Sequence, residues 1–248
     1  MSKLSEKAAR NLKAVREKKP LVHNITNLVV MNYTANALLA MGASPVMAHA
    51  ENEVEEMVSH AGSLVLNIGT LTDDTVVSMI KAGKKASIQK TPIILDPVGA
   101  GATSLRTVSA QKIIAETNIS VIRGNASEIL SLRHSDSKTK GVDSVHAVDD
   151  AAQTAKTLAS ELKTTLAITG PVDFITESNR VYRVSNGHPL MARVTGTGCT
   201  AALAYFGLAG EIAGESASAP GSFMIGMLDA LYTITPDQLK EDCKIENG

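Results

Sequence analysis

Aromatic residues are scarce in this chain, which has three Phe, four Tyr and no Trp among its 248 residues. Proteins that bind single-stranded nucleic acids commonly stack the bases on aromatic side chains, and few rings are available here for stacking on bases or sugars. We therefore expect a ligand to be held mostly by backbone groups and small side chains.

An excess of charge of either sign is also lacking. The chain has 24 Lys and Arg against 25 Asp and Glu, a formal net charge of −1. Nucleic-acid-binding domains usually carry a basic excess or a basic stripe, and the basic runs here are no longer than Lys18-Lys19 or Lys84-Lys85. Disordered chains combine low hydrophobicity with high net charge, whereas 44% of these residues are hydrophobic and 20% are charged. The composition favours a globular protein that does not bind nucleic acid.

The sequence has only two cysteines, and its composition predicts neither a signal peptide nor a membrane span. Cys199 and Cys243 form no Cys-x-x-Cys motif, which favours an intracellular protein with two free thiols. Residues 1–19 are charged throughout and lack the apolar core of a signal peptide. Residues 20–50 contain no Asp, Glu, Lys or Arg, but Asn, Gly and Pro interrupt them, whereas a membrane span needs ~20 predominantly apolar residues. We expect a cytoplasmic protein without a membrane partner.

Short β-branched runs alternate with helix-forming segments along the chain. Strands are predicted at 21–25, 44–47, 64–68, 92–96, 120–123, 165–169, 174–176 and 180–185. Helices are predicted at 28–41, 53–61, 107–116, 125–132, 149–162, 199–212 and 223–232, with another opening at Thr72. Residues 133–148 are predicted to form an exposed connection, and the last dozen residues are polar. Repeated strand–helix units with a late hairpin predict one α/β domain over residues 1–248, a three-layer α/β/α sandwich with a mainly parallel central sheet.

Two predicted strands end on charged residues, at the edge of the sheet where ligands bind in open α/β folds. Asp96 precedes a glycine turn and could position Mg²⁺ or a phosphate chain, although a tight turn alone would explain the glycines. Arg123 suits polyphosphate because its fork matches phosphate oxygens. Asn125 and Glu128 have the spacing of a capping box, so a cap and a functional role both stay open.

Two glycines precede the helix predicted after residue 198, in the segment 194–200. The N–H groups that such glycines expose, together with the helix dipole, form an anion site. The segment is not a Walker A loop, because no Gly-Lys-Ser/Thr follows. Cys199 falls in the first turn of this helix, where a thiolate is favoured, although its residue type also suits a small buried side chain. The Thr-Gly turn after Thr169 is a weaker indication of a ligand site, because most such turns only reverse the chain.

Six motifs occur in a fixed order and together resemble those of the hydroxyethylthiazole kinase family, whose fold is ribokinase-like. They are Leu21–Asn27, Asn67–Thr70, Asp96–Thr103, Ile122–Ile129, Thr169–Asp173 and Gly196–Cys199. The resemblance extends from about Leu21 to Thr235, and the combination is specific although each motif alone is not. It implies that ATP phosphorylates the hydroxyl of 4-methyl-5-(2-hydroxyethyl)thiazole to give the monophosphate in thiamine salvage. It also implies Mg²⁺ and a homotrimer with active sites between neighbouring subunits.

The same resemblance implies roles for individual residues. Arg123 and Thr169 would contact ATP, and Asp96 and Glu128 would lie on the metal side. The thiazole would meet Asn27, Met47 and Gly196, and the transferring phosphoryl group would meet Gly196, Thr197 and Gly198. Met47 suits a sulfur heterocycle because its side chain is polarizable and adaptable.

The chain departs in two respects from related kinases. Most ribokinase-like enzymes place Asp where Cys199 stands, whereas thiazole kinases commonly have Cys. A loose transition state needs little help from a base, so we expect positioning to dominate and Cys199, the predicted catalytic residue, to act weakly or to line the site. Only 20 residues separate Cys199 from Pro220. The family usually has two substantial helices in this region, so we expect this chain to lack about one helix there.

Several alternatives stay open at this stage. Hydroxymethylpyrimidine kinases and carbohydrate kinases share the fold, but few aromatic residues and the cysteine in the glycine motif argue mildly against them. An ADP-dependent nicotinamide-nucleotide-hydrate dehydratase has the same architecture and would be expected to carry Asp at position 199. A catalytically weak protein that binds a nucleotide or a thiazole is the third alternative, because the region before Pro220 is short.

Overall fold

The computed structural model describes residues 3–133, 147–177, 180–196 and 203–247. Its strands are β1 (Leu21–Ile25), β2 (Ser44–Val46), β3 (Ser63–Asn67), β4 (Ile93–Asp96), β5 (Val121–Asn125), β6 (Thr165–Thr169), β7 (Asp173–Glu177), β8 (Arg180–Val184) and β9 (Ile245–Asn247). Its α-helices are α1 (Lys3–Lys18), α2 (Met31–Met41), α3 (Val54–His60), α4 (Asp73–Gln89), α5 (Ser104–Glu116), α6 (Ala126–Ser131), α7 (Ala147–Leu162), α8 (Leu203–Ser216), α9 (Pro220–Thr233) and α10 (Pro236–Asp242). A 3₁₀ helix, η1, covers Pro189–Arg193.

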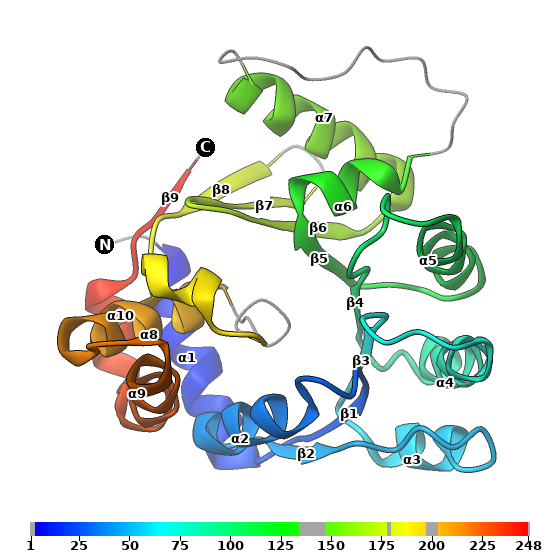
Figure 1. Cartoon of the computed structure of the whole chain (residues 1–248), viewed down its shortest axis with the longest axis horizontal. Helices are drawn as coiled ribbons and strands as arrows, with labels where there is room; N and C mark the ends of the chain where they lie inside the picture. Colours follow the sequence, from blue (N-terminus) through cyan, green and yellow to red (C-terminus); the bar gives the residue numbers. More distant parts are fainter. Residues whose placement is uncertain (1–2, 134–146, 178–179, 197–202, 248) are drawn as a thin grey trace.

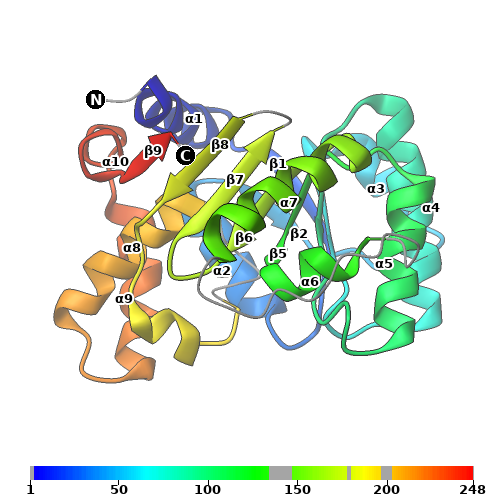
Figure 2. The same ribbon diagram turned by 90° about the horizontal axis from the view of Figure 1, so that it is seen from above.

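The nine strands form one sheet in the order β2-β1-β3-β4-β5-β6-β7-β8-β9. The pairs from β2 to β6 are parallel, and the pairs from β6 to β9 are antiparallel. The predicted hairpin is therefore confirmed as β7 and β8. Strand β9 pairs with β8, and α10 and α1 lie beside it, so the two ends of the chain come together at this edge (Figure 2).

Helices cover the sheet in two layers, as the sequence predicted (Figure 1). The helices α3, α4, α5, α6 and α7 share one apolar cluster with the strands, which includes Leu64, Leu66, Ile93 and Leu95. The helices α1, α2, α8, α9 and α10 share a second cluster, centred on Phe206 and Phe223. Alternating residues of a strand point to opposite faces of the sheet, and Leu64, Leu66, Ile93, Leu95 and Ile122 on the first face are completely buried.

The second face of the central strands is less well covered. Val65, Ile94 and Val121 form a row across β3, β4 and β5, in which Val65 pairs with Ile94 and Ile94 with Val121. All three side chains are half-buried, although central parallel strands are normally buried on both faces. The helical layer on this side therefore leaves part of the sheet accessible.

Local sequence signals explain several element boundaries. Gly42 ends α2 in the left-handed conformation (φ 96°), with its N–H bonded to carbonyls of the last turn. Thr72 caps α4 by accepting from the Thr75 N–H, and Asn125 and Glu128 form a reciprocal capping box at α6. The helix expected to open at Thr72 and the capping box expected at Asn125 are therefore confirmed.

Other boundaries differ from those predicted. Helix α2 begins at Met31 rather than residue 28, because Asn27 Oδ1 accepts from the Val30 N–H and holds the intervening residues in a turn. Helix α5 begins at Ser104 rather than residue 107, because Thr103 caps it. Helices α1 and α10 and strand β9 were not predicted. Most of the connection predicted at 133–148 lies outside the described residues. Among the described helices, none has the length and apolar character needed to cross a membrane.

Candidate active site

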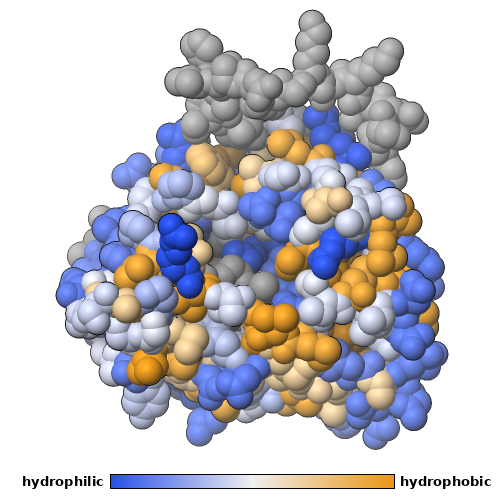
Figure 3. Space-filling view, viewed as in Figure 1, coloured by the Kyte–Doolittle hydropathy of each residue, from blue (hydrophilic) through white to orange (hydrophobic). Residues whose placement is uncertain are grey.

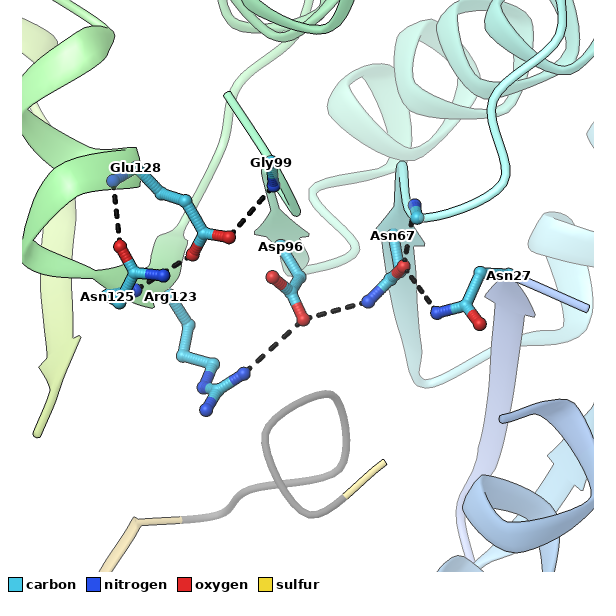
Figure 4. Close-up of polar contacts among 8 residues, drawn as sticks. Asn27, Asn67, Asp96, Gly99, Arg123, Asn125 and Glu128 are labelled. Atoms are coloured by element: carbon cyan, nitrogen blue, oxygen red, sulfur yellow. Dashed lines mark hydrogen bonds and ion pairs between the residues drawn. The ribbon is translucent and has the colours of Figure 1, made fainter. Parts of the chain in front are cut away.

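Four consecutive strands of the sheet bring one polar side chain each toward their carboxyl edge (Figure 4): Asn67 and Asp96 end β3 and β4, Asn27 follows β1, and Arg123 lies two residues before the end of β5. Arg123 Nη1 lies 3.4 Å from Asp96 Oδ2, which also accepts from Asn67 Nδ2 at 2.8 Å. Asn67 Oδ1 in turn accepts from Asn27 Nδ2 at 2.8 Å. We call Asn27, Asn67, Asp96 and Arg123 the polar row. Because parallel strands end at the same edge, residues nearly 100 positions apart meet there.

The Arg123 guanidinium is nearly buried, with a side chain only 11% exposed. Its Nε is buried and has no hydrogen-bond partner among the described residues. An Arg whose donors are not all used by the protein is suited to bind an anion, because five N–H groups form a rigid fork.

Asp173 is a second carboxylate whose pKa is affected by Arg123. Burial raises the pKa of Asp173, while a hydrogen bond from the Gly170 N–H and the positive charge of Arg123 oppose this rise. Arg123 therefore interacts with two acidic residues, Asp96 at the end of β4 and Asp173 at the start of β7.

A cavity of about 710 Å³ lies beside Arg123. Thr169, Gly170 and Asp173 line it on the sheet side, and Asn186 and Gly187 line it beyond β8. The rest of the lining is largely apolar and includes Pro171, Pro189, Met191, Ala192 and Phe206. A site with an apolar part and a buried Arg at one end suits a ligand with a flat ring and an anionic group.

Glu128 and Arg106 hold the glycine turn that follows Asp96. Glu128 Oε1 accepts from the Gly99 N–H at 2.8 Å, and Oε2 accepts from the Asn125 N–H at 2.9 Å. Arg106 donates to the carbonyl oxygens of Ile68, Gly69 and Val98. The loops after β3 and β4 are thus tied to each other and to α6.

The remaining predicted residues lie toward β1 and β2. Gly196 is in the left-handed region (φ 90°) and lies against Val30 and Tyr33, beside the turn that Asn27 holds. Met47 directly follows β2 and is half-buried. Thr197, Gly198 and Cys199 lie outside the described residues, while Cys243 is a free thiol. The face seen in Figure 1 is hollowed near its centre, and apolar surface borders the hollow (Figure 3).

Comparisons with known proteins show the family. The model of the "Hydroxyethylthiazole kinase family" matches residues 12–205. A hydroxyethylthiazole kinase from Desulfotalea psychrophila is 61% identical, covering 100% of this chain and 98% of its own. The chain belongs to the hydroxyethylthiazole kinase family. A relative with the same name from Thermoanaerobacter is 50% identical over 95% of this chain and 98% of its own.

Solved structures place this kinase in the ribokinase-like fold, as predicted. A hydroxyethylthiazole kinase from Pyrococcus horikoshii matches with a TM-score of 0.89 and 43% identity, and covers all of both chains. The pyridoxal kinase of Staphylococcus aureus matches with a TM-score of 0.52 at 12% identity over 93% of this chain and 98% of its own, which shows the fold alone. The names of the full-length relatives do not favour the pyrimidine, carbohydrate or dehydratase alternatives.

The kinase is shorter than its relative from Desulfotalea psychrophila within the aligned region. The alignment spans 268 positions, 20 more than the 248 residues that it covers in this chain. The difference matches the length of about one helix with its loop, which is the amount by which the region before Pro220 was expected to be short. Only α8 lies between Gly196 and α9 among the described residues.

Sequence reasoning missed several residues that shape this site. Asn67 was part of a motif, but its place between Asn27 and Asp96 depends on the strand order. Asp173 also lay in a motif, but nothing indicated its proximity to Arg123. Asn186 and Gly187, which line the cavity, lay in no motif; the one available signal was an Asn-Gly pair directly after a predicted strand.

The described carboxylates fit a magnesium ion of the kind that kinases use. No three His, Cys, Asp or Glu side chains gather as a metal cluster in the part of the chain that the structure describes. Mg²⁺ is commonly held by one or two carboxylates together with phosphate oxygens and water, so a complete protein cage is not required. Asp96 has the carboxylate chemistry and the place at the sheet edge, and Glu128 is fixed behind the glycine turn.

Proposed function

We propose that this kinase transfers the γ-phosphoryl group of ATP to the hydroxyl of 4-methyl-5-(2-hydroxyethyl)thiazole, giving the thiazole monophosphate and ADP. The observation that carries the proposal is the nearly buried Arg123, with its unpaired Nε, beside a largely apolar cavity at the carboxyl edge of the sheet. The family to which the chain belongs supports the identity of the acceptor.

The cavity and the polar row suggest how the two substrates are arranged. The adenine ring would occupy the apolar part of the cavity, with the phosphates directed toward Arg123 and Thr169. The thiazole would lie toward Asn27, Met47 and Gly196, at the opposite end of the polar row. The γ-phosphoryl group would then lie between them, near the backbone of Gly196, Thr197 and Gly198.

The chemistry requires little from a side chain acting as a base. The hydroxyl oxygen of the thiazole alcohol attacks the γ-phosphorus, the bond to the bridging oxygen of ADP breaks, and the hydroxyl proton passes to Cys199 or to water. Phosphoryl transfer depends mainly on positioning and on stabilising the charge on phosphate oxygens. Arg123 and the backbone N–H groups of the glycine segment would supply this, and Cys199 would accept the proton weakly or line the site.

Mg²⁺ when bound would neutralise charge on the phosphates, and Asp96 and Glu128 are the residues proposed to hold it. We further propose a homotrimer with active sites between subunits, acting in thiamine salvage in the cytoplasm. Exposed apolar side chains close to the site in sequence support a subunit interface, because Leu28 and Val29 are 71% and 69% exposed directly after Asn27.

A substrate panel tests the proposal. Release of ADP from ATP would be measured with the thiazole alcohol, hydroxymethylpyrimidine and simple sugars as acceptors. We expect turnover with the thiazole alcohol. Turnover confined to the pyrimidine or a sugar would contradict the acceptor, and binding of the thiazole without turnover would favour a sensor.

The Arg123→Lys variant tests the nucleotide side. Lysine keeps the charge but loses the planar fork. Because hydrogen bonds to charged groups contribute ~1.5–3 kcal/mol, kcat/KM for ATP should fall about 10- to 150-fold. Arg180→Lys, at an exposed position at the start of β8, is the matched control and should leave kcat/KM unchanged. Equal values for both variants would show that Arg123 does not bind the phosphates.

A further inference from the structure

Helix α8 carries a stripe of three glycines that allows the cavity loop to lie against it. A Cβ atom at Gly207 would be 2.6 Å from the Asn186 carbonyl oxygen, and one at Gly210 would be 2.7 Å from the Met191 sulfur. At Gly214 it would be 2.4 Å from the His188 ring. Residues three and four apart share one face of a helix, so residues 186–191 pack along one side of α8.

Glu211 lies on that same side, four residues after Gly207, and binds the cavity loop directly. Its Oε2 accepts from Asn186 Nδ2 at 3.2 Å, and its Oε1 accepts from the Gly187 N–H at 3.2 Å. Lys244 Nζ donates to Oε1 at 2.7 Å. One carboxylate thus gathers donors from the loop and from the chain segment just before β9.

Asn186 is fixed from a second direction as well. It is 6% exposed, and its Nδ2 also donates to the Asp242 carbonyl at 3.1 Å while its Oδ1 accepts from the Lys244 N–H at 2.8 Å. The Ser185 N–H donates to the Lys244 carbonyl. Because every hydrogen-bonding group of the Asn186 amide is used, the side chain has one favourable orientation.

We propose that Glu211 is a positioning residue for nucleotide binding. Asn186 and Gly187 line the cavity beside Arg123, and Glu211 holds both of them against α8, while Lys244 joins the segment before β9 to the same carboxylate. The cavity wall is then preorganised, and the nucleotide does not have to order it on binding. This inference rests on the proposed function, because the cavity is taken to bind the nucleotide.

The Glu211→Gln variant of the full chain tests the inference. Glutamine keeps the size of the side chain but loses its charge. It also replaces one carboxylate oxygen with an NH₂ group, which would face the donors that now bind Glu211. We expect KM for ATP to rise about tenfold, as loss of one or two charge-assisted hydrogen bonds would produce. KM for the thiazole alcohol and kcat should change less than about twofold, because Glu211 has no hydrogen bond to any member of the polar row among the described residues.

Two further measurements separate this inference from the proposed function. The Kd for ADP, measured by calorimetry without an acceptor, should also rise about tenfold in Glu211→Gln. Glu116→Gln, which removes the partly exposed ion pair with Lys84 on the other side of the sheet, is the matched control and should leave Kd unchanged. If wild type binds ADP but does not phosphorylate the thiazole alcohol, the proposed acceptor is wrong while the effect of Glu211 on ADP can still be measured.

Two results would overturn the inference. One is an unchanged KM for ATP and Kd for ADP in Glu211→Gln. The other is an equal change in both KM values and kcat, which would indicate a general structural role. If the variant does not fold, Lys244→Met decides instead, because it removes one of the three contacts; a rise of about threefold in Kd for ADP supports the inference and no rise overturns it.

Discussion

The close approach of α8 to the cavity loop predicts opposite effects of the same substitution at two helix glycines. In Gly207→Ala, the new Cβ would be 2.6 Å from the carbonyl oxygen and 2.8 Å from the carbonyl carbon of Asn186. In Gly226→Ala on α9, the nearest atom would be 3.4 Å away, at the Cβ of Ala213. Both glycines lie inside helices, so the gain in helix propensity is similar, up to ~1 kcal/mol.

The difference between the variants therefore measures the cost of the clash. The Asn186 backbone would have to move by about 0.8 Å to reach the ordinary contact distance of 3.4 Å. Hydrogen bonds to Glu211, Asp242 and Lys244 resist this movement. Overpacking of this kind costs ~1–3 kcal/mol, and each kcal/mol shifts the melting temperature of a chain of this size by ~2–4 °C. For a central value of ~2 kcal/mol, Gly207→Ala should melt about 4–8 °C below Gly226→Ala.

Differential scanning calorimetry on the two variants and the wild type measures this difference. Gly226→Ala should melt at or slightly above the wild type. Gly207→Ala should also weaken binding of ADP, because Asn186 and Gly207 both line the cavity. Melting temperatures within about 1 °C of each other would show that Asn186 retreats without cost, which would refute the view that the wall is held rigidly.

Two further predictions concern stability. Burial lowers the pKa of His23 below 6.5, so the unfolded chain takes up a proton that the folded chain does not, and stability should fall as pH falls through 6.5. Urea unfolding about one unit above and below that pH should show this loss, and His23→Asn should reduce it; an unchanged pH dependence in the variant would exclude His23 as its source. If the 20 extra positions of the Desulfotalea psychrophila relative lie between Gly196 and Pro220, a chimera that carries its segment there should melt about 5–10 °C higher, because covering on the order of 100 Å² of apolar sheet contributes ~2.5 kcal/mol. An unchanged melting temperature would indicate that the 20 missing positions lie elsewhere in the chain.

The parts of the fold that follow from local patterns could be predicted from the sequence. The caps at Thr72 and Asn125 depend on residues three positions apart, and the turn at Gly42 depends on a single residue. Helix α10 was missed although Thr235 caps it, because Leu239 is its only fully buried anchor. Strand β9 could not be found locally, since three residues become a strand only through pairing with β8.

Individual residues of the candidate site could be proposed from the sequence, but their contacts with one another could not. Asp96 and Arg123 were recognisable because each was predicted to end a strand with a charge, although β5 continues two residues past Arg123. Their contact, and the place of Asn67 beside them, depends on the order in which β3, β4 and β5 pair. One signal for Glu211 was available, because it is a charged residue among the glycines and apolar residues of α8. Its hydrogen-bond partners could not be predicted, because they come from segments distant in the sequence.

The site thus divides into two parts that differ in how they are held. The polar row is fixed by the ends of adjacent strands, whose other face packs into a completely buried core. The cavity wall is carried by a loop that packs on α8 and on the segment before β9. The half-buried row of Val65, Ile94 and Val121 lies on the face of Asn67, Asp96 and Arg123, where side chains two positions apart in a strand point the same way. A shortened helical layer on that face would therefore lower stability and weaken nucleotide affinity more than it would disturb the strand-end groups that we propose to face the reacting phosphate.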